Sequence, residues 1–261
     1  MNEVRVNDVK AYVRANIGSF HSSRLERLRK LKLSDILRRK NPYLFKAKNI
    51  LLAQDLVRTL LDAHLSSQEE ALFGTFLEGL AIFVNRRVYG GRKSSTEGVD
   101  LEFDKGSIRY IVAIKSGPNW GNSSQIRKMK DDFKRAKRTL RTGDPKMQIV
   151  AVNGCCYGRD NNPDKGDYHK YCGQRFWEFI SGNEDLYLKL IKPLGYAARR
   201  KNAEFLKEYA QIVNRFTAEF SRDFVRDGEI DWVALVRFNS CASKTATKPT
   251  LAPPVAEGRD A

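Results

Sequence analysis

Residues 99–115 alternate between apolar and polar side chains in two stretches, which a glycine-containing turn separates. Alternation with a period of two is typical of strands that bury one face, so the two stretches predict a β-hairpin with Lys105–Gly106 as its loop. The expected cross-strand pairs are Phe103 with Ile108, Leu101 with Tyr110, and Val99 with Val112, all on one apolar face. The opposite face then carries Asp100, Glu102, Arg109, Ile111, Ala113 and Lys115.

Helical spacing of apolar residues predicts helices on both sides of this hairpin. One is expected at 50–65, and a second follows Ser66–Ser67 and ends before Gly90–Gly91. After the loop GPNWGNSS come a basic helix at 125–141, a third strand at 147–152 and a polar loop at 153–171. Further helices are expected at 176–180, 185–191 and 202–224. The whole predicts an α/β fold, with a small mixed sheet flanked by helices and helical N- and C-terminal extensions.

Composition shifts predict where the chain divides. Residues 1–48 are basic and helical in pattern, residues 49–239 hold the predicted sheet and its helices, and the proline-containing tail at 240–261 is expected to be disordered.

The net charge of +16 points to a polyanionic partner, because such an excess of Lys and Arg attracts nucleic acid. A hydrophobic content of 41% argues against wholesale disorder. No apolar run is long enough to cross a bilayer, and the charged start lacks the apolar stretch of a secretory signal. We therefore expect a cytoplasmic protein that binds nucleic acid and no membrane.

The cysteines admit two readings. Cys155, Cys156 and Cys172 with His169 supply enough ligands for a zinc ion, but adjacent cysteines fit one ion poorly and the chain has no Cys-x-x-Cys pair. The favoured interpretation is reduced cysteines packed near the end of a strand.

Asp100, Glu102 and Lys115 are the residues best suited to chemistry. Carboxylate oxygens on one face of a hairpin can hold a hard divalent cation, and a lysine beside them can stabilise charge that develops on a phosphate. The alternative is a solvated sheet face on which Glu102 forms a cross-strand ion pair with Arg109.

An acid, a hairpin and a strand that ends in Lys115 resemble the PD-(D/E)XK nuclease signature. Gly98, Asp100, Lys115–Ser116 and Gln125 also resemble the pattern of RecB-type nucleases. Longer stretches resemble the PmeII family of type II restriction endonucleases over about residues 35–240. They are KNPYLFKAKN, SSQEEALFG, FLEGLAIFV, YIVAIKSGPNWGNSSQ, VNGCCYGRDNNPDKGDY and CGQRFWEFISGN. The resemblance implies an endonuclease with a PD-(D/E)XK core that uses Mg²⁺ to cleave duplex DNA at a short sequence.

The sequence departs from that signature at Ala113, where an acid is expected two residues before the lysine. The second metal-binding carboxylate must then come from Glu102 or from Glu78, on the helix that precedes the hairpin. We favour Glu78, because Arg109 can neutralise Glu102. In the implied mechanism, Asp100 and this second acid bind Mg²⁺ beside the scissile phosphate, Lys115 contacts the attacking water, and Gln125 orients the water or the phosphate or is simply a surface residue.

The charges predict which residues contact DNA. One helix carries cations that can neutralise phosphates: Arg127, Lys128, Lys130, Lys134, Arg135, Lys137, Arg138 and Arg141. Base reading is expected from Asn119, Trp120 and Asn122 and from the stretch 153–174, which includes Arg159 and Gln174; Trp120 can equally be part of the core. A palindromic site would call for a homodimer, and a restriction system implies a cognate DNA methyltransferase. The alternatives are a basic DNA-binding module with a degenerate nuclease site, or a structure-specific or RNA-directed nuclease.

Overall fold

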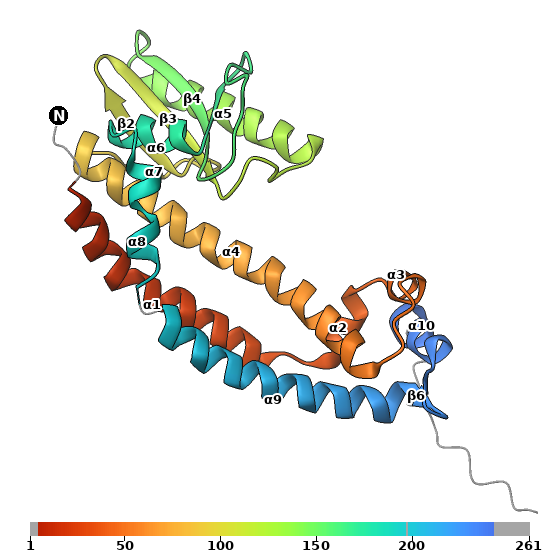
Figure 1. The fold of residues 1–261 in the computed structure, drawn as a ribbon. Coiled ribbons are helices and arrows are strands. Elements are labelled where there is room, and N and C mark those ends of the chain that lie inside the picture. Colours follow the sequence, from red (N-terminus) through yellow and green to blue (C-terminus); the bar gives the residue numbers. More distant parts are fainter. Residues whose placement is uncertain (1–4, 197, 243–261) are drawn as a thin grey trace, which may run out of the picture. The chain divides into compact units, whose positions relative to one another are not determined.

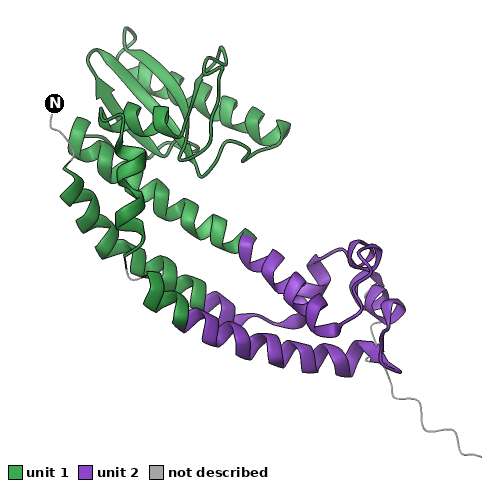
Figure 2. Cartoon of the chain, viewed as in Figure 1, with its two compact units in different colours: residues 1–25, 67–203 green, residues 26–66, 204–261 purple. Residues whose placement is uncertain are grey.

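The computed structural model describes residues 5–196 and 198–242, and they belong to two compact units (Figure 2). Unit 1 comprises residues 1–25 and 67–203, and unit 2 comprises residues 26–66 and 204–261. The helices α1 (Val6–Lys30), α4 (Ala53–Tyr89) and α9 (Ala198–Phe224) contribute residues to both units. The basic segment expected at 1–48 is therefore shared between the units, and most of the tail expected at 240–261 lies outside the described residues.

Unit 1 contains a five-stranded mixed sheet in the order β1–β2–β3–β4–β5 (Figure 1). The strands are β1 (Arg92–Lys93), β2 (Leu101–Lys105), β3 (Ile108–Lys115), β4 (Gln148–Cys155) and β5 (His169–Cys172). The first three are antiparallel, whereas β3, β4 and β5 are parallel. Because parallel neighbours need a crossover connection, the chain returns from the end of β3 to the start of β4 through α5 (Ser123–Gly143).

Helices cover both faces of this sheet. One face packs against α1, α4 and α6 (Gln174–Ser181), and α7 (Leu186–Lys189) and α8 (Ile191–Leu194) follow along the chain. Residues in this core include Val13, Leu80, Leu101, Val112, Ile114 and Phe176. The other face packs against α5, with Val99, Ile111, Ala113, Met129, Phe133 and Ala151 among its core residues. The predicted α/β fold with a mixed sheet flanked by helices is confirmed, and it is consistent with a restriction-endonuclease-like core.

The hairpin forms as predicted, but its register differs by two residues. Leu101 pairs with Val112 and Phe103 with Tyr110, so the loop is Gly106–Ser107 instead of Lys105–Gly106. Gly106 has a φ of 64°, which suits the first loop position of a type II′ turn. A shift of two residues keeps each side chain on its face, so the faces are as predicted from Leu101 onward.

Val99 is the exception to this pattern, because it packs in the core on the α5 side. The backbone N–H of Asp100 donates to the carbonyl of Val112 (2.8 Å), the same residue that pairs with Leu101. Two residues opposite one are typical of a β-bulge, which interrupts the alternation between Val99 and Leu101.

Two other predicted boundaries are wrong. The helix expected to break at Ser66–Ser67 continues through α4, since serine costs a helix interior far less than glycine or proline does. Gly90, with a φ of 69°, ends it as predicted. The loop expected at 153–171 contains the end of β4 and most of β5, whose short sequence HKYC gives no alternating signal.

Unit 2 contains parts of the three shared helices together with α2 (Leu33–Arg39), α3 (Pro42–Ala47) and α10 (Trp232–Ser240). Asn41 caps α3 by accepting hydrogen bonds from Tyr43 and Leu44 N–H groups. The strands β6 (Val225–Arg226) and β7 (Glu229–Ile230) form a small hairpin before α10. No helix in the described part of either unit is long and apolar enough to span a bilayer.

Candidate active site

Asp100 lies at the bulge where β2 begins, and its carboxylate is held against β3. The backbone N–H of Ile114 donates to Asp100 Oδ2 at 2.6 Å. Gly98 makes this approach possible, because its φ of 78° suits glycine and an added Cβ would stand 2.4 Å from Asp132 on α5. The sequence-predicted acid is thereby fixed next to the residue that precedes Lys115.

Lys115 is the last residue of β3 and is only partly buried. Its ammonium nitrogen lies 5.0 Å from the centroid of the Trp120 ring, and its carbonyl accepts a hydrogen bond from the Cys156 N–H at 3.0 Å. Because Asp100 contacts Ile114, the acid and the lysine lie at the same end of β3, and a shared catalytic site for the two stays a prediction.

Glu78 approaches this end of the sheet from α4. The neighbouring core positions Leu77, Leu80, Ala81 and Val84 are buried, whereas Glu78 is half-buried. Its carboxylate lies 3.5 Å from the ammonium group of Lys93, which pairs with Leu101 beside Asp100.

A second set of contacts relates Glu78 to the end of β3. One turn before it, a Cβ at Gly74 would stand 3.5 Å from the Cβ of Ser116, the residue after Lys115. Burial, with a further contribution from the charge of Glu78, raises the pKa of Cys156 to about 12. Glu78 is therefore near the start of β2 and near the ends of β3 and β4.

Glu102, the other candidate, points to the α5 side of the sheet but lies further from Lys115. It pairs with Ile111, four residues before Lys115, and a strand rise of 3.3 Å per residue makes this an offset of about 13 Å. Its side chain is 6% exposed, accepts a hydrogen bond from Ser94 Oγ (2.5 Å) and pairs with Arg92 (3.3 Å).

The ion pair expected between Glu102 and Arg109 is absent from these contacts. In the observed register Arg109 lies opposite Asp104, and its guanidinium donates to both carboxylate oxygens at 2.5 and 2.8 Å. This bidentate contact lowers the pKa of Asp104 and raises that of Arg109.

The residues present fit a magnesium ion that is shared with a phosphate. The described residues contain no group of three or more His, Cys, Asp or Glu placed to hold a metal. Mg²⁺, however, is usually bound by one or two carboxylates, and water and substrate phosphates complete its six ligands. Asp100 and Glu78 are two carboxylates at this end of the sheet, so the type of donor fits this ion, and their joint binding of it stays a prediction.

Gln125 and Asn122 form the capping box of α5. The Asn122 side chain accepts from the Gln125 N–H (3.1 Å), and the Gln125 side-chain oxygen accepts from the Asn122 N–H (3.0 Å). These contacts explain why both residues stand at the start of α5; a role for Gln125 in orienting water or phosphate, or for Asn122 in reading bases, stays a prediction.

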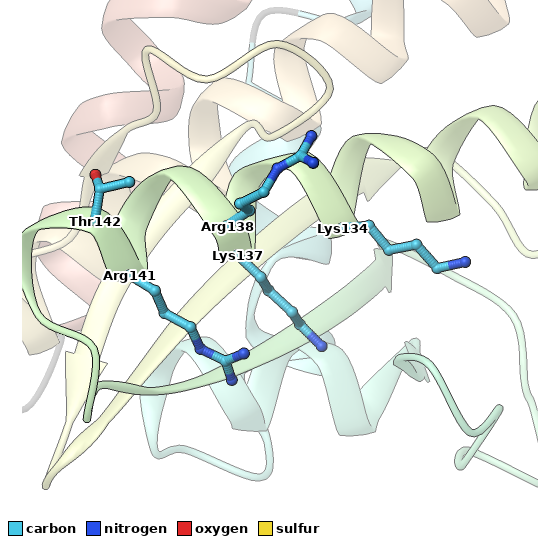
Figure 3. A pocket seen from close by; sticks show the side chains of 5 residues that line it. All are labelled: Lys134, Lys137, Arg138, Arg141 and Thr142. Atoms are coloured by element: carbon cyan, nitrogen blue, oxygen red, sulfur yellow. The ribbon is translucent and has the colours of Figure 1, made fainter.

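The cations of α5 differ in their surroundings. Lys128 pairs with Glu97 (3.2 Å), Lys130 with Asp167 (3.2 Å), and Arg135 with Asp132. Four cations and Thr142 line an open pocket of about 410 Å³ near the end of the helix (Figure 3): Lys134, Lys137, Arg138 and Arg141. Among the described residues, the lining of this pocket includes no acidic side chain, and Lys137 also donates to the Asp167 carbonyl (3.4 Å).

The segment between β4 and β5 is organised by ion pairs. Asp160 pairs with Lys165 (3.0 Å) and Lys170 (3.4 Å), and Lys170 also donates to the Pro118 carbonyl (3.0 Å). This last contact joins the segment to the loop that follows Lys115. Arg159, Asn119 and Gln174 are exposed, and their contact with DNA stays a prediction.

Comparison with known families identifies the family to which this chain belongs. A sequence model of the family described as type II restriction endonuclease EcoO109I matches residues 7–202. The chain belongs to this family. The same comparison confirms a type II restriction endonuclease, the class expected from the sequence. A search of curated proteins gave no match.

Two residues near the candidate site have contacts that the sequence does not predict, Lys93 and Asn153. Asn153 is 1% exposed, accepts from the Trp120 indole N–H (3.1 Å) and donates to the Ala113 carbonyl (3.2 Å). The sequence predicts a polar loop and base reading at this position. An asparagine directly after the apolar run 147–152 is, however, equally consistent with a buried, hydrogen-bonded polar residue. Lys93 gave no signal, because β1 is too short to show alternation.

The cysteines of unit 1 are buried at strand ends. Cys155 and Cys172 end β4 and β5, Cys156 follows β4, and none is in a disulfide. Burial raises the pKa of all three thiols, so they are protonated at neutral pH. Cys241 is exposed.

We expect Cys241 to react alone with a thiol reagent in the native protein at pH 8. The other three cysteines are buried and their thiols are protonated, whereas the thiolate is the form that reacts. Titration with a chromogenic disulfide should give one fast equivalent, and all four cysteines should react in denaturant. Cys241→Ser is the control that removes the fast phase; a second fast thiol in that variant would contradict the buried placement.

Proposed function

We propose that this restriction endonuclease hydrolyses a phosphodiester bond of duplex DNA at a short sequence, with Mg²⁺ held by Asp100 and Glu78. The observation that carries the proposal is the hydrogen bond from Ile114 to the Asp100 carboxylate, which sets an acid beside the strand end that bears Lys115. Family membership supports DNA as the substrate.

In the proposed reaction, a water oxygen bonds to phosphorus and gives up a proton, while the bond from phosphorus to the leaving oxygen breaks and that oxygen takes up a proton. Bound Mg²⁺ supplies Lewis acidity to the phosphate and lowers the pKa of water. Lys115 stabilises the negative charge that builds up on the attacking oxygen and on the phosphate. Asp100 and Glu78 would hold this ion beside the scissile phosphate.

The same proposal extends to the partners that the sequence predicts. A two-fold DNA site calls for a homodimer, and a cytoplasmic restriction enzyme calls for a DNA methyltransferase that protects the host site. The narrower assignment to the PmeII family, made from sequence stretches, stays a prediction.

Ala113 favours one second candidate, a DNA-binding module without cleavage. If neither Glu78 nor Glu102 shares an ion with Asp100, one carboxylate and one lysine remain, and the protein binds DNA without cutting it. A structure-specific or RNA-directed nuclease is the third reading, with the same site and another substrate.

Incubation of plasmid DNA with the protein, with and without Mg²⁺, separates these candidates. We expect discrete fragments only with Mg²⁺, and losses of about a thousandfold or more in Asp100→Ala and Lys115→Ala, whose DNA affinity stays near that of the parent. A smear means a nonspecific nuclease, and intact but retarded DNA means a binding module. Full cleavage by either variant would reject the assignment of the site.

The choice between Glu78 and Glu102 is tested by two isosteric variants. Glu78→Gln should lower the single-turnover cleavage rate about a hundredfold or more, and raising Mg²⁺ should restore part of it, because one ligand is lost. Glu102→Gln should cleave within about threefold of the parent and lower thermal stability, since it removes the charge of a buried carboxylate that pairs with Arg92 and accepts from Ser94 Oγ. The reverse pattern would assign the ion to Glu102.

The location of the cationic pocket on α5 determines which phosphates of a bound duplex it can contact. A crossover between parallel strands runs back along the sheet, so the start of α5 lies near Lys115 and its end near the start of β4. From Ser123 to Arg138 the helix rises about 22 Å at 1.5 Å per residue. This distance equals about six base pairs, so the pocket fits phosphates that flank the cleavage site.

The variant Lys134→Ala/Arg138→Ala/Arg141→Ala should therefore distinguish DNA lengths. We expect about tenfold weaker binding to a duplex with about 15 flanking base pairs on each side of the site, and a salt slope smaller by about 2.7. A duplex with about three flanking base pairs should bind this variant as tightly as it binds the parent protein. Equal loss on both duplexes would place these contacts inside the site, and no loss would remove the pocket from the DNA interface.

A further inference from the structure

Trp120 lies directly beside the lysine of the proposed site. The ammonium nitrogen of Lys115 is 5.0 Å from the ring centroid, within the range of a cation–π interaction. A lysine side chain has a flexible four-carbon stem, so without a partner its charge occupies many positions. The ring face of Trp120 favours one of them.

Trp120 is itself fixed by a buried asparagine. Its indole N–H donates to Asn153 Oδ1 (3.1 Å), and Asn153 Nδ2 donates to the Ala113 carbonyl (3.2 Å). Ala113 precedes Lys115 by two residues on β3 and pairs with Asn153 on β4. These contacts form a closed series of interactions. It runs from Lys115 through Trp120 and Asn153 back to β3, the strand that carries Lys115.

The loop that carries Trp120 is held at two further points. The Pro118 carbonyl accepts from Lys170 (3.0 Å), and Asn122 caps α5. Gly117 fits closely, because an added Cβ would stand 2.4 Å from the ring of Tyr157. A loop fixed at these points holds the ring in place before any substrate arrives.

We infer that Trp120 is a positioning residue, which together with Asn153 holds the ammonium group of Lys115 where the proposed reaction needs it. This inference rests on the proposed function. It also replaces the base-reading role that the sequence predicts for Trp120, because the indole N–H already bonds to Asn153 and the ring face already contacts Lys115.

An NMR experiment on the intact protein tests the contact without cleavage. The chain has three tryptophans, and the indole N–H signal that Trp120→Phe removes is that of Trp120. Lys115→Met should shift this signal and leave the other two in place. Lys46→Met is the matched control, because Lys46 lies 5.5 Å from the Trp232 ring in unit 2 and should shift only that signal. An unmoved Trp120 signal in Lys115→Met would overturn the inference.

Single-turnover cleavage at saturating protein tests the consequence. Trp120→Leu should lower the rate about tenfold or more, and Trp120→Phe, which keeps a ring face, should recover part of the loss. The DNA dissociation constant should change less than about threefold in both. Trp232→Leu should cleave at the parent rate.

Two outcomes separate the explanations. A raised dissociation constant with an unchanged single-turnover rate in Trp120→Leu would make Trp120 a DNA contact and overturn the inference. Normal cleavage by Lys115→Ala would instead overturn the proposed function, and the NMR experiment would still decide whether the ring and the ammonium group are in contact.

Discussion

The hydrogen bond between the Asp100 carboxylate and the Ile114 N–H is the contact on which the site depends. An antiparallel ladder normally joins backbone to backbone, but here a side-chain oxygen takes a bond that the backbone would otherwise make. The bulge at Asp100 permits this, since two residues face Val112 and the strand is released from regular pairing. A charged acceptor makes such a bond stronger and shorter than a neutral one. The carboxylate therefore has a fixed place next to Lys115 before a metal ion or DNA is bound.

The crossover through α5 separates the chemistry from the charge. Lys115 ends β3, α5 starts after a short loop, and the helix returns to the start of β4. The first turn of α5 is uncharged and capped, whereas four cations line a pocket nearer its end: Lys134, Lys137, Arg138 and Arg141. One βαβ connection thus places the proposed catalytic lysine at one end of the sheet and the cationic pocket about 20 Å away along the helix.

The sequence predicts the faces of the sheet better than its register. Alternation fixes which side chains share a face, but a slip of two residues leaves every face unchanged, and the catalytic roles of Asp100 and Lys115 stay predictions. Only the turn decides between registers, and Gly106 suits the first loop position instead of the second. Elements without alternation, such as β1 and β5, gave no signal. The approach of Glu78 depends on how α4 packs against Ser116 and Lys93, which no local pattern encodes.

The packing around Ala113 explains why this position holds no acid, although the PD-(D/E)XK signature has one there. The residue is 1% exposed, lies in the apolar core beneath α5 and pairs with Asn153, whose amide is already bonded to Trp120 and to the Ala113 carbonyl. A carboxylate there would be desolvated next to the strand segment that holds Asp100, and like charges in a buried site raise each other's free energy. Glu78 is half-buried and has the ammonium group of Lys93 at 3.5 Å, so its charge is balanced while the site is empty of substrate. In the proposed site, a second acid supplied from α4 thus avoids a buried, unpaired charge and leaves room for the asparagine that bonds to Trp120.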